Sequence, residues 1–287
     1  MNTSAQTVGR NLQADGHYLP KIKQHSLEKH RRHNYVTKQF AGATKIKWPQ
    51  RAYVGLYAGA GRAKIEGTGE IVETPALSVL RQPFTHHIFV EKDPVCMHAL
   101  EKRVAALQTG HAPKFILGDV NERVGDIRKA LPLYGPGNGL LSFCFVDPFS
   151  AELDFRTIRA LAVYRMDFLI LLALGHDVVR NFWEHYYWDR SNMRIANLIC
   201  CPGWREEFVA AGGRNIVRFI LKKFDETMVG VGYQSPKPEH HCAIRSGGRL
   251  LYYLVLYSKS QLGLTFWENT NTGLTPQLDL GLFTEGH

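Results

Sequence analysis

Five short apolar runs recur through the middle of this chain, and helix-compatible segments separate them. A run of this length, bounded by glycine, proline or charged residues, is typical of a buried strand. The runs are AYVGLY (52–57), HHIFVEKD (86–93), KFILGD (114–119), LLSFCFVDPF (140–149) and DFLILLAL (167–174). The predicted helices are 95–107, 121–131 and 155–164. This alternation predicts an α/β protein with a doubly wound, mostly parallel sheet, because right-handed crossovers place helices on both faces.

The rhythm changes after residue 175. An aromatic-rich segment comes first, then a stretch that fits one or two helices, then two predicted strands. These segments are 180–188, 204–224, 227–233 and 250–257. The connection between the two strands, SPKPEHHCAIRSGG (235–248), is short. We therefore expect an antiparallel last strand that closes a seven-stranded sheet.

The N-terminal part differs in composition from the rest of the chain. Residues 1–18 are polar and lack periodicity, whereas 21–40 suit a helix that Gly42 can end. The predicted organisation has four parts: a flexible N-terminus (1–20), a basic helix and linker (21–50), a Rossmann-like domain (51–270) and a C-terminal tail (271–287).

Basic residues outnumber acidic ones, 35 to 26, for a formal net charge of +9. Much of the excess lies early in the chain, which favours a polyanionic partner at long range. Two interpretations stay open for this segment: a nucleic-acid contact, with Lys21, Lys23 and His25 as candidate binding residues, or a solvated helix face. No apolar run approaches the ~20 residues of a membrane-spanning helix, and the beginning lacks the apolar core of a secretory signal. We therefore expect no membrane association and a cytoplasmic location.

The five cysteines form no CxxC pair. Neither a disulfide framework nor a zinc ribbon is indicated. The densest group of potential metal ligands is His240, His241 and Cys242, which lacks a second well-spaced pair. A polar loop is the preferred interpretation, and no metal is expected.

The residues that directly follow the strands form a set of candidate ligand-binding groups, because ligands bind beyond the carboxyl ends of parallel strands. AGAG (58–61) follows the first strand, and small side chains let a backbone turn approach a ligand. Glu91, Asp119 and Asp147 end the next three strands. A carboxylate such as Glu91 can accept hydrogen bonds from both ribose hydroxyls. The alternative for each acid is that it caps the following helix. The insertion 62–75 is interpreted as a loop over the ligand.

The ordered set of motifs over residues 21–269 resembles the three-Cys-motif partner proteins. The motifs are the early Lys23/His25 segment, YAGAG with Thr74-Pro75 downstream, IFVEKD, GDVN, VDPFS and LYYLVLYSKSQLGLTFW. Members of this family look like Rossmann-like class I methyltransferases that use S-adenosylmethionine, and they are named for an associated radical enzyme. The resemblance therefore implies that fold, that cofactor and a protein partner.

The resemblance also implies roles for individual residues. Tyr57, Ala58, Gly59 and Gly61 are the expected cofactor loop, with Glu91 and Lys92 at the ribose and Asp119 and Val120 near adenine. Similar sequences carry an acid two positions before the loop aromatic, whereas this chain has Gly55 there. That departure weakens the expected grip on the amino group of the cofactor, unless another residue compensates.

Methyl transfer from a sulfonium chiefly requires that the acceptor be aligned with the methyl group. Asp147 and the Pro148 carbonyl can accept hydrogen bonds from an exocyclic amine while Phe149 stacks on its ring; alternatively, Phe149 belongs to the core. The aromatic residues after the fifth strand can stack a base or cover the sheet.

Three functions compete: a methyltransferase acting on a nucleic-acid base or related polar acceptor, a non-catalytic protein that works in a complex, and a dinucleotide oxidoreductase, which the DPF motif disfavours.

Overall fold

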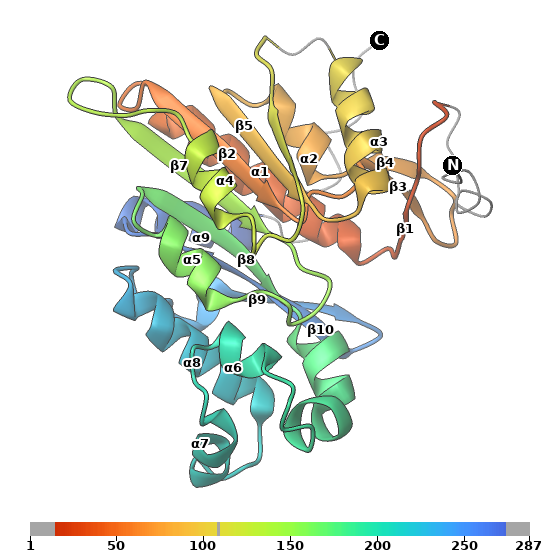
Figure 1. Ribbon diagram of the computed structural model, residues 1–287, viewed down its shortest axis with the longest axis vertical. Coiled ribbons are helices and arrows are strands. Elements are labelled where there is room, and N and C mark those ends of the chain that lie inside the picture. Colours follow the sequence, from red (N-terminus) through yellow and green to blue (C-terminus); the bar gives the residue numbers. More distant parts are fainter. Residues whose placement is uncertain (1–14, 108–109, 274–287) are drawn as a thin grey trace.

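The apolar runs form the central sheet of this computed structural model, which describes residues 15–107 and 110–273. The strand order is β6-β5-β2-β7-β8-β10-β9, and Figure 1 labels each of these strands except β6. The strands are β2 (Gln50–Leu56), β5 (His86–Glu91), β6 (Lys114–Leu117), β7 (Leu140–Val146), β8 (Met166–Leu172), β9 (His241–Ser246) and β10 (Arg249–Tyr257). Neighbouring strands are parallel except that β10 runs antiparallel to both β8 and β9. This order, with one reversed last strand, confirms the predicted Rossmann-like class I methyltransferase fold.

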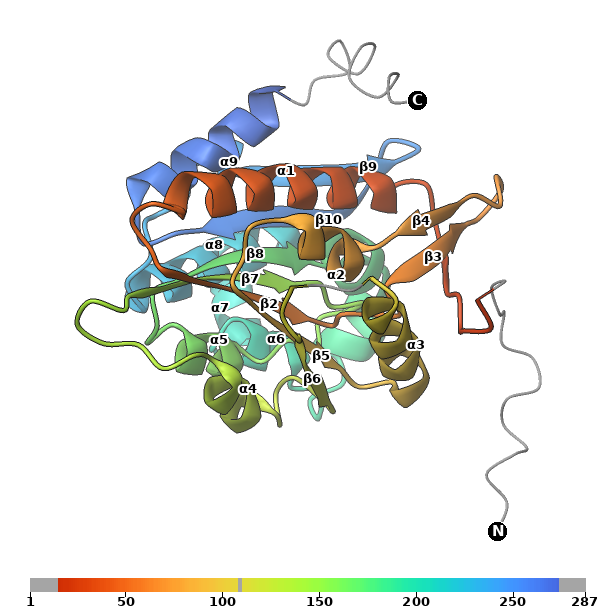
Figure 2. The same ribbon diagram turned by 90° about the horizontal axis from the view of Figure 1, so that it is seen from above.

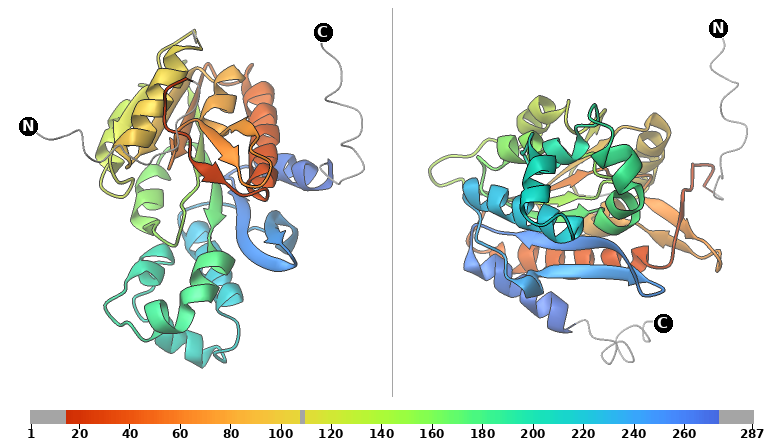
Figure 3. Two further views of the ribbon diagram at one scale, coloured as in Figure 1. Left: turned by 90° about the vertical axis from the view of Figure 1, so that its right-hand side faces the viewer. Right: turned by 90° about the horizontal axis from the view of Figure 1, so that it is seen from below.

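Helices cover both faces of the sheet (Figures 2 and 3). One face packs against α1 (Ser26–Thr44), α2 (Pro75–Ser78), α3 (Pro94–Ala105) and α9 (Gln261–Gly273). The other packs against α4 (Val124–Ala130), α5 (Phe155–Leu161), α6 (Arg194–Leu198), α7 (Trp204–Ala210) and α8 (Ile216–Gly230). The sheet is therefore doubly wound, as the alternating pattern predicts.

Alternate residues of each strand point to opposite faces and so divide the core in two. In β2, Val54 and Leu56 belong to one apolar cluster, while Tyr53 belongs to the other. The neighbouring side chains Ile88 and Val90 in β5 are fully buried as well. Burial on both faces explains why these strands are nearly continuous apolar runs in the sequence.

Helix α1 starts later and ends later than the sequence predicts. Lys21 and Ile22 are not helical but form β1 (Lys21–Ile22), which pairs with β3 (Arg62–Ile65) in a small sheet completed by β4 (Ile71–Glu73). The insertion 62–75 is therefore largely a hairpin and not a loop without structure. The helix continues past Gly42 because Ala41 and Thr44 are buried against the molecule, and this packing outweighs the low helix propensity of one glycine.

The C-terminal prediction is wrong at one strand. Residues 227–233 are not a strand, since α8 extends to Gly230. The sixth strand in chain order within the main sheet is instead β9, in the segment expected to be a connection, and it pairs antiparallel with β10. Two π-helical turns, η2 (Leu174–Val179) and η3 (Phe182–Tyr187), follow β8. Over the described ranges, no helix is long and apolar enough to cross a membrane.

Candidate functional site

The carboxyl ends of β2, β5, β6 and β7 meet along one edge of the sheet. Glu91 is the last residue of β5, Tyr57 and Asp147 directly follow β2 and β7, and Asp119 lies two residues after the end of β6. The strands are adjacent in the order β6-β5-β2-β7 and mutually parallel. The structure therefore brings the predicted strand-end residues to one edge, where ligands of such sheets bind.

The loop after β2 is held in a conformation that favours glycine. Tyr57, Gly59 and Gly61 have φ angles of 63°, 68° and 82°. A Cβ on Gly59 would meet no atom within 4 Å, so this position faces open space. A Cβ on Gly61 would lie 2.9 Å from atoms of both Leu77 and Leu100. Gly59 thus leaves room for a ligand, whereas Gly61 lets buried leucines pack against the loop.

Glu91 fastens this loop to the end of β5. Its Oε2 accepts a hydrogen bond from the Gly59 amide at 2.8 Å, and its Oε1 accepts one from the Asp93 amide at 2.9 Å. The cap of α3 is Asp93, whose carboxylate accepts from the Val95 amide at 2.7 Å. Capping is therefore not the role of Glu91. Lys92 turns outward and pairs with Glu152 at 2.6 Å.

The hydroxyl of Tyr57 is buried beside several carboxylates. It finds no hydrogen-bond partner among the described residues. Burial, together with the negative charges of Glu152, Asp119 and Glu91, raises the pKa of Tyr57 well above its usual value. The hydroxyl therefore stays protonated and is available to a ligand as a donor or an acceptor.

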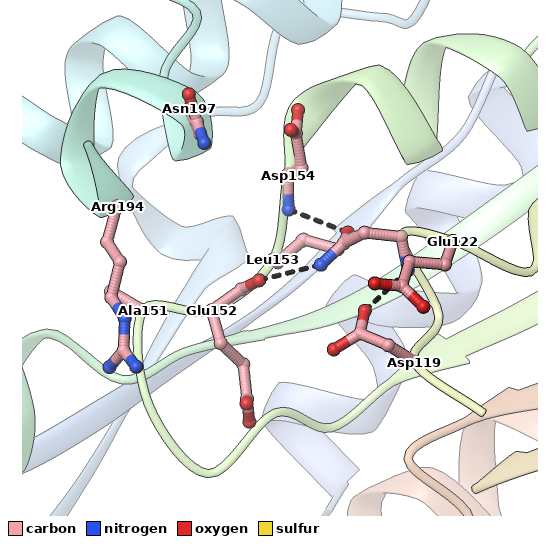
Figure 4. Close-up of a pocket in the computed structure, with 9 residues that line it drawn as sticks. Asp119, Glu122, Ala151, Glu152, Leu153, Asp154, Arg194 and Asn197 are labelled. Atoms are coloured by element: carbon pink, nitrogen blue, oxygen red, sulfur yellow. Dashed lines mark hydrogen bonds between the residues drawn. The ribbon is translucent and has the colours of Figure 1, made fainter. Parts of the chain in front are cut away.

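A polar pocket of about 270 Å³, called here the Asp119 pocket, opens beyond β6 (Figure 4). It is lined by Asp119, Asn121, Glu122, Ala151, Glu152, Leu153, Asp154, Arg194 and Asn197. Asn121 ties its walls together: its amide donates to Asp119 Oδ1 at 2.8 Å, its side-chain nitrogen donates to the Glu152 carbonyl at 2.9 Å, and its side-chain oxygen accepts from the Asp154 amide at 3.0 Å. Asp119 thus closes the turn before α4 and also faces the pocket. Val120 is buried in the core and does not line it.

A second cavity of about 140 Å³, called here the α1 cavity, lies between α1, the glycine loop, residues 74–76 and the end of β7. Within it, Lys29 Nζ donates to both carboxylate oxygens of Asp147, at 2.8 and 2.7 Å. The two side chains are only 13% and 17% exposed. The sequence identifies Asp147 as a candidate but gives no indication of Lys29 as its partner. Asp147 forms this pair and does not cap a helix.

The residues after Asp147 are divided between the core and the surface. Pro148 is buried, whereas the Phe149 side chain is 84% exposed. The alternative that Phe149 belongs to the core is therefore wrong. The Phe149 carbonyl accepts a hydrogen bond from His176 Nε2 at 2.8 Å. The centroids of the Phe149 and His176 rings lie 5.9 Å apart, in an edge-to-face arrangement. These contacts fix the backbone at Phe149 and leave its ring open to solvent.

The aromatic residues after β8 have divided roles. Trp183 and Trp188 are 56% and 66% exposed, and their rings are stacked with the two ring centroids 6.1 Å apart. Tyr186 is buried and donates to Asp177 Oδ2 at 2.7 Å. The same carboxylate oxygen accepts from the Ala151 amide at 2.8 Å. Asp177 therefore connects the η turns to the segment that carries Phe149.

Lys21, Lys23 and His25, the candidate nucleic-acid contacts, lie before α1 and do not line the α1 cavity. Both lysines are exposed. Burial and the charges of Lys23, Lys29 and His176 lower the pKa of His25. The two lysines therefore carry positive charge just before the N-terminal end of α1, whereas the His25 imidazole is neutral at pH 7.

The neighbouring histidines of the candidate metal cluster point to different partners. His240 Nε2 lies 2.9 Å from Glu268, and His241 Nε2 lies 2.9 Å from Asp225. Across 15–107 and 110–273, no group of three or more histidine, cysteine or acidic side chains could hold a metal ion. Each histidine is thus a member of a separate structural pair.

No family model matches this chain, and no curated protein matches it either. Among solved structures, the chain is similar to P. horikoshii TYW2 in complex with MeSAdo, at 13% identity and a TM-score of 0.40, over 81% of this chain and 62% of that one. It is also similar to the O-methyltransferase TomG from Streptomyces achromogenes in complex with SAM, at 10% identity and a TM-score of 0.43, over 84% and 92% of the two chains. M. jannaschii TYW2 in complex with AdoMet matches at 9% identity and a TM-score of 0.42, over 82% and 74%. The chain spans less than two thirds of the P. horikoshii protein.

Proposed function

We propose that this chain binds S-adenosylmethionine and transfers its methyl group to an acceptor. One observation carries the proposal: the Glu91 carboxylate is fixed by the Gly59 amide directly beside the open position of Gly59. A carboxylate held in this way at the end of the second strand is suited to a ribose diol, and the glycine loop allows close approach of the nucleoside.

Other residues of the edge fit the same ligand. Asp119 is available to the adenine amino group from its pocket, and the unpartnered hydroxyl of Tyr57 lies among the carboxylates that surround the nucleoside position. A buried hydroxyl without a partner costs free energy unless a ligand supplies one. Lys92 and Val120 contribute less directly, through the pair with Glu152 and through packing.

The bound cofactor supplies an electrophilic methyl group, and the protein has to position the acceptor in line with it. The acceptor side of the proposal consists of the Pro148 carbonyl as hydrogen-bond acceptor and the exposed Phe149 ring as stacking surface. A nucleic-acid base fits this combination, because every base has an aromatic face and several carry an exocyclic amine. The net charge of +9 and the exposed Lys21 and Lys23 favour a polyanion as its carrier.

Calorimetric titration tests the cofactor part of the proposal. The purified protein is titrated with S-adenosylmethionine and, separately, with NAD. Binding of the first and not the second supports the proposal, whereas selective NAD binding would replace it with an oxidoreductase. Transfer is then measured with methyl-labelled S-adenosylmethionine against RNA, single-stranded DNA and a peptide mixture, and label in RNA or DNA supports a nucleic-acid acceptor.

A second candidate is a non-catalytic protein that keeps the cofactor fold and acts with a protein partner, such as a radical enzyme. The ion pair between Lys29 and Asp147 favours it, because a paired carboxylate is less available to an acceptor amine. Cofactor binding without any methyl transfer to the three acceptor classes would support this candidate over an enzyme.

A further inference from the structure

The α1 cavity contains charged groups of both signs in a largely buried position. Lys29 and Asp147 both line it and are paired with each other, with Lys29 Nζ 2.7 Å from Asp147 Oδ2. An ammonium group has three N–H donors, and Lys29 directs donors at the two oxygens of Asp147. The carboxylate has about four acceptor positions. The pair can therefore receive one more negative and one more positive group.

Two further polar atoms at this cavity are buried and have no hydrogen-bond partner among the described residues, His30 Nδ1 and Thr74 Oγ1. The His30 side chain is buried as a whole, at 8% exposure, whereas Thr74 is half-buried and only its hydroxyl is covered. Burial and the charge of Lys29 lower the pKa of His30 well below its usual value, so the ring is neutral at pH 7. Buried polar groups without partners are uncommon in folded proteins and indicate a missing water or ligand.

Gly55 lies on the wall of the same cavity, with Ala58 and Gly59 beside it. A Cβ on Gly55 would stand 3.1 Å from the Phe89 ring and 3.2 Å from the Tyr53 ring. A side chain at this position would therefore require these rings to shift by a few tenths of an ångström, and Gly55 itself supplies no charge. Any negative group for a ligand ammonium must come from elsewhere, and Asp147 is the carboxylate that lines this cavity.

We infer that the α1 cavity binds the zwitterionic amino-acid end of the nucleoside ligand, with Lys29 at its carboxylate, Asp147 at its ammonium group, and Thr74 and His30 supplying neutral hydrogen bonds. This inference rests on the proposed function and assigns its amino-acid subsite. In the bound state the ligand carboxylate lies next to Lys29 and the ligand ammonium group next to Asp147, so each charge has neighbours of opposite sign. The ion pair between Lys29 and Asp147 is therefore kept. Asp147 then acts in ligand binding and not on the methyl acceptor.

The test compares two ligands that share the nucleoside and differ in the amino-acid end. S-adenosylmethionine carries the zwitterion, and 5′-methylthioadenosine lacks it. Calorimetry is run on the full chain and on Lys29→Met. We expect the variant to bind S-adenosylmethionine about 10- to 100-fold more weakly, as for the loss of one charge-assisted hydrogen bond, and to bind methylthioadenosine as the unmodified protein does.

Thr74→Val is the second variant, because Lys29→Met leaves Asp147 buried without its partner and can impair folding. The Thr74 hydroxyl has no partner among the described residues, so its replacement by an isosteric methyl group costs the free protein little. We expect a selective loss of about 3- to 10-fold in S-adenosylmethionine affinity, the value of one neutral hydrogen bond. Lys38→Met is the matched control, since Lys38 is exposed on the same helix, and it should change neither affinity.

The outcomes separate the inference from the proposed function. Loss of S-adenosylmethionine affinity alone, in either variant, supports the subsite. Equal loss of both ligands, or no loss in folded Lys29→Met and Thr74→Val, overturns the subsite while the proposed function stands. A third variant, Asp147→Asn, tests the role of this carboxylate. If it binds S-adenosylmethionine normally but no longer transfers methyl groups, the assignment of Asp147 to the amino-acid subsite is overturned as well. If the unmodified protein binds neither ligand, the proposed function fails and the inference fails with it.

Discussion

The replacement of Glu91 by glutamine tests the nucleoside site most directly. A carboxylate has about four acceptor positions, and the structure shows two of them in use, by the amides of Gly59 and Asp93. Two positions remain, one on each oxygen, which matches the two hydroxyls of a ribose. Glutamine keeps one oxygen and turns the other into a donor, so it cannot serve both amides and both hydroxyls.

The magnitude follows from this count. A hydrogen bond to a charged group contributes about 1.5–3 kcal/mol. Glu91→Gln loses the charge and at least one of the two ribose hydrogen bonds, so we expect a loss of about 3 kcal/mol in binding free energy. This corresponds to about a hundredfold increase in the Kd of S-adenosylmethionine. In the free protein one backbone amide loses its partner, which lowers the free energy of unfolding by about 1–3 kcal/mol.

Calorimetric titration measures the first quantity and urea unfolding the second. Methylthioadenosine should lose affinity to the same extent as S-adenosylmethionine, because both carry the ribose. Glu101→Gln is the control: it removes an exposed acid from α3 and should leave binding unchanged. An affinity of folded Glu91→Gln within twofold of the unmodified protein would refute the ribose role.

Three further predictions concern the loop, pH and the acceptor. Gly59→Ala should cost about 1–2 kcal/mol of stability from its positive φ alone, whereas Gly61→Ala should cost about 2–4 kcal/mol because its Cβ also overlaps buried leucines, as urea unfolding can compare. Burial lowers the pKa of His33 from 6.5 to about 4. The folded state then excludes a proton that the unfolded chain binds, so stability should fall as the pH drops from about 6.5 to 4, and His33→Gln should reduce that slope. Phe149→Ala should leave thermal stability and S-adenosylmethionine affinity unchanged, since the ring is 84% exposed, but lower methyl transfer to a base; unchanged transfer in labelled-methyl assays would contradict its stacking role.

The sequence predicts the parallel strands well for a physical reason. A strand covered on both faces must be apolar at nearly every position, as β8 is, where all of Met166–Leu172 is buried. The strand ends follow from the same runs, so the meeting of Tyr57, Glu91, Asp119 and Asp147 at one edge could be expected. Their roles toward a ligand stay predictions.

Strand β9 could not be found in this way. It lies at the edge of the sheet, and only Ile244 among its residues is buried. An edge strand with one buried side chain leaves no apolar run in the sequence. The stretch 227–233 looks like a strand because of its valines and tyrosine, but Phe224 and Met228 continue the buried face of α8 at helical spacing.

The pair between Lys29 and Asp147 is beyond the reach of sequence patterns as well. The two residues are separated by 118 positions, and no periodicity connects them. The basic character of the N-terminal segment suggests either a polyanion contact or a solvated face. Instead, α1 lies along the sheet with one side buried, at His33, Val36 and Phe40 among others, and brings a lysine to the cavity.

That arrangement makes the first helix of the chain part of the binding equilibrium. Lys29 and His30 reach the α1 cavity only when α1 is docked against the end of β7. A ligand that needs both side chains therefore holds the helix in place, and at about 100 times its Kd it adds about 2.7 kcal/mol to the stability of the docked form. During synthesis the cavity cannot close until Asp147 has left the ribosome, long after α1. We therefore expect amide hydrogen exchange in Ser26–Thr44 to be slower in the ligand-bound protein than in the free protein, so that this rate reports whether the α1 cavity is occupied.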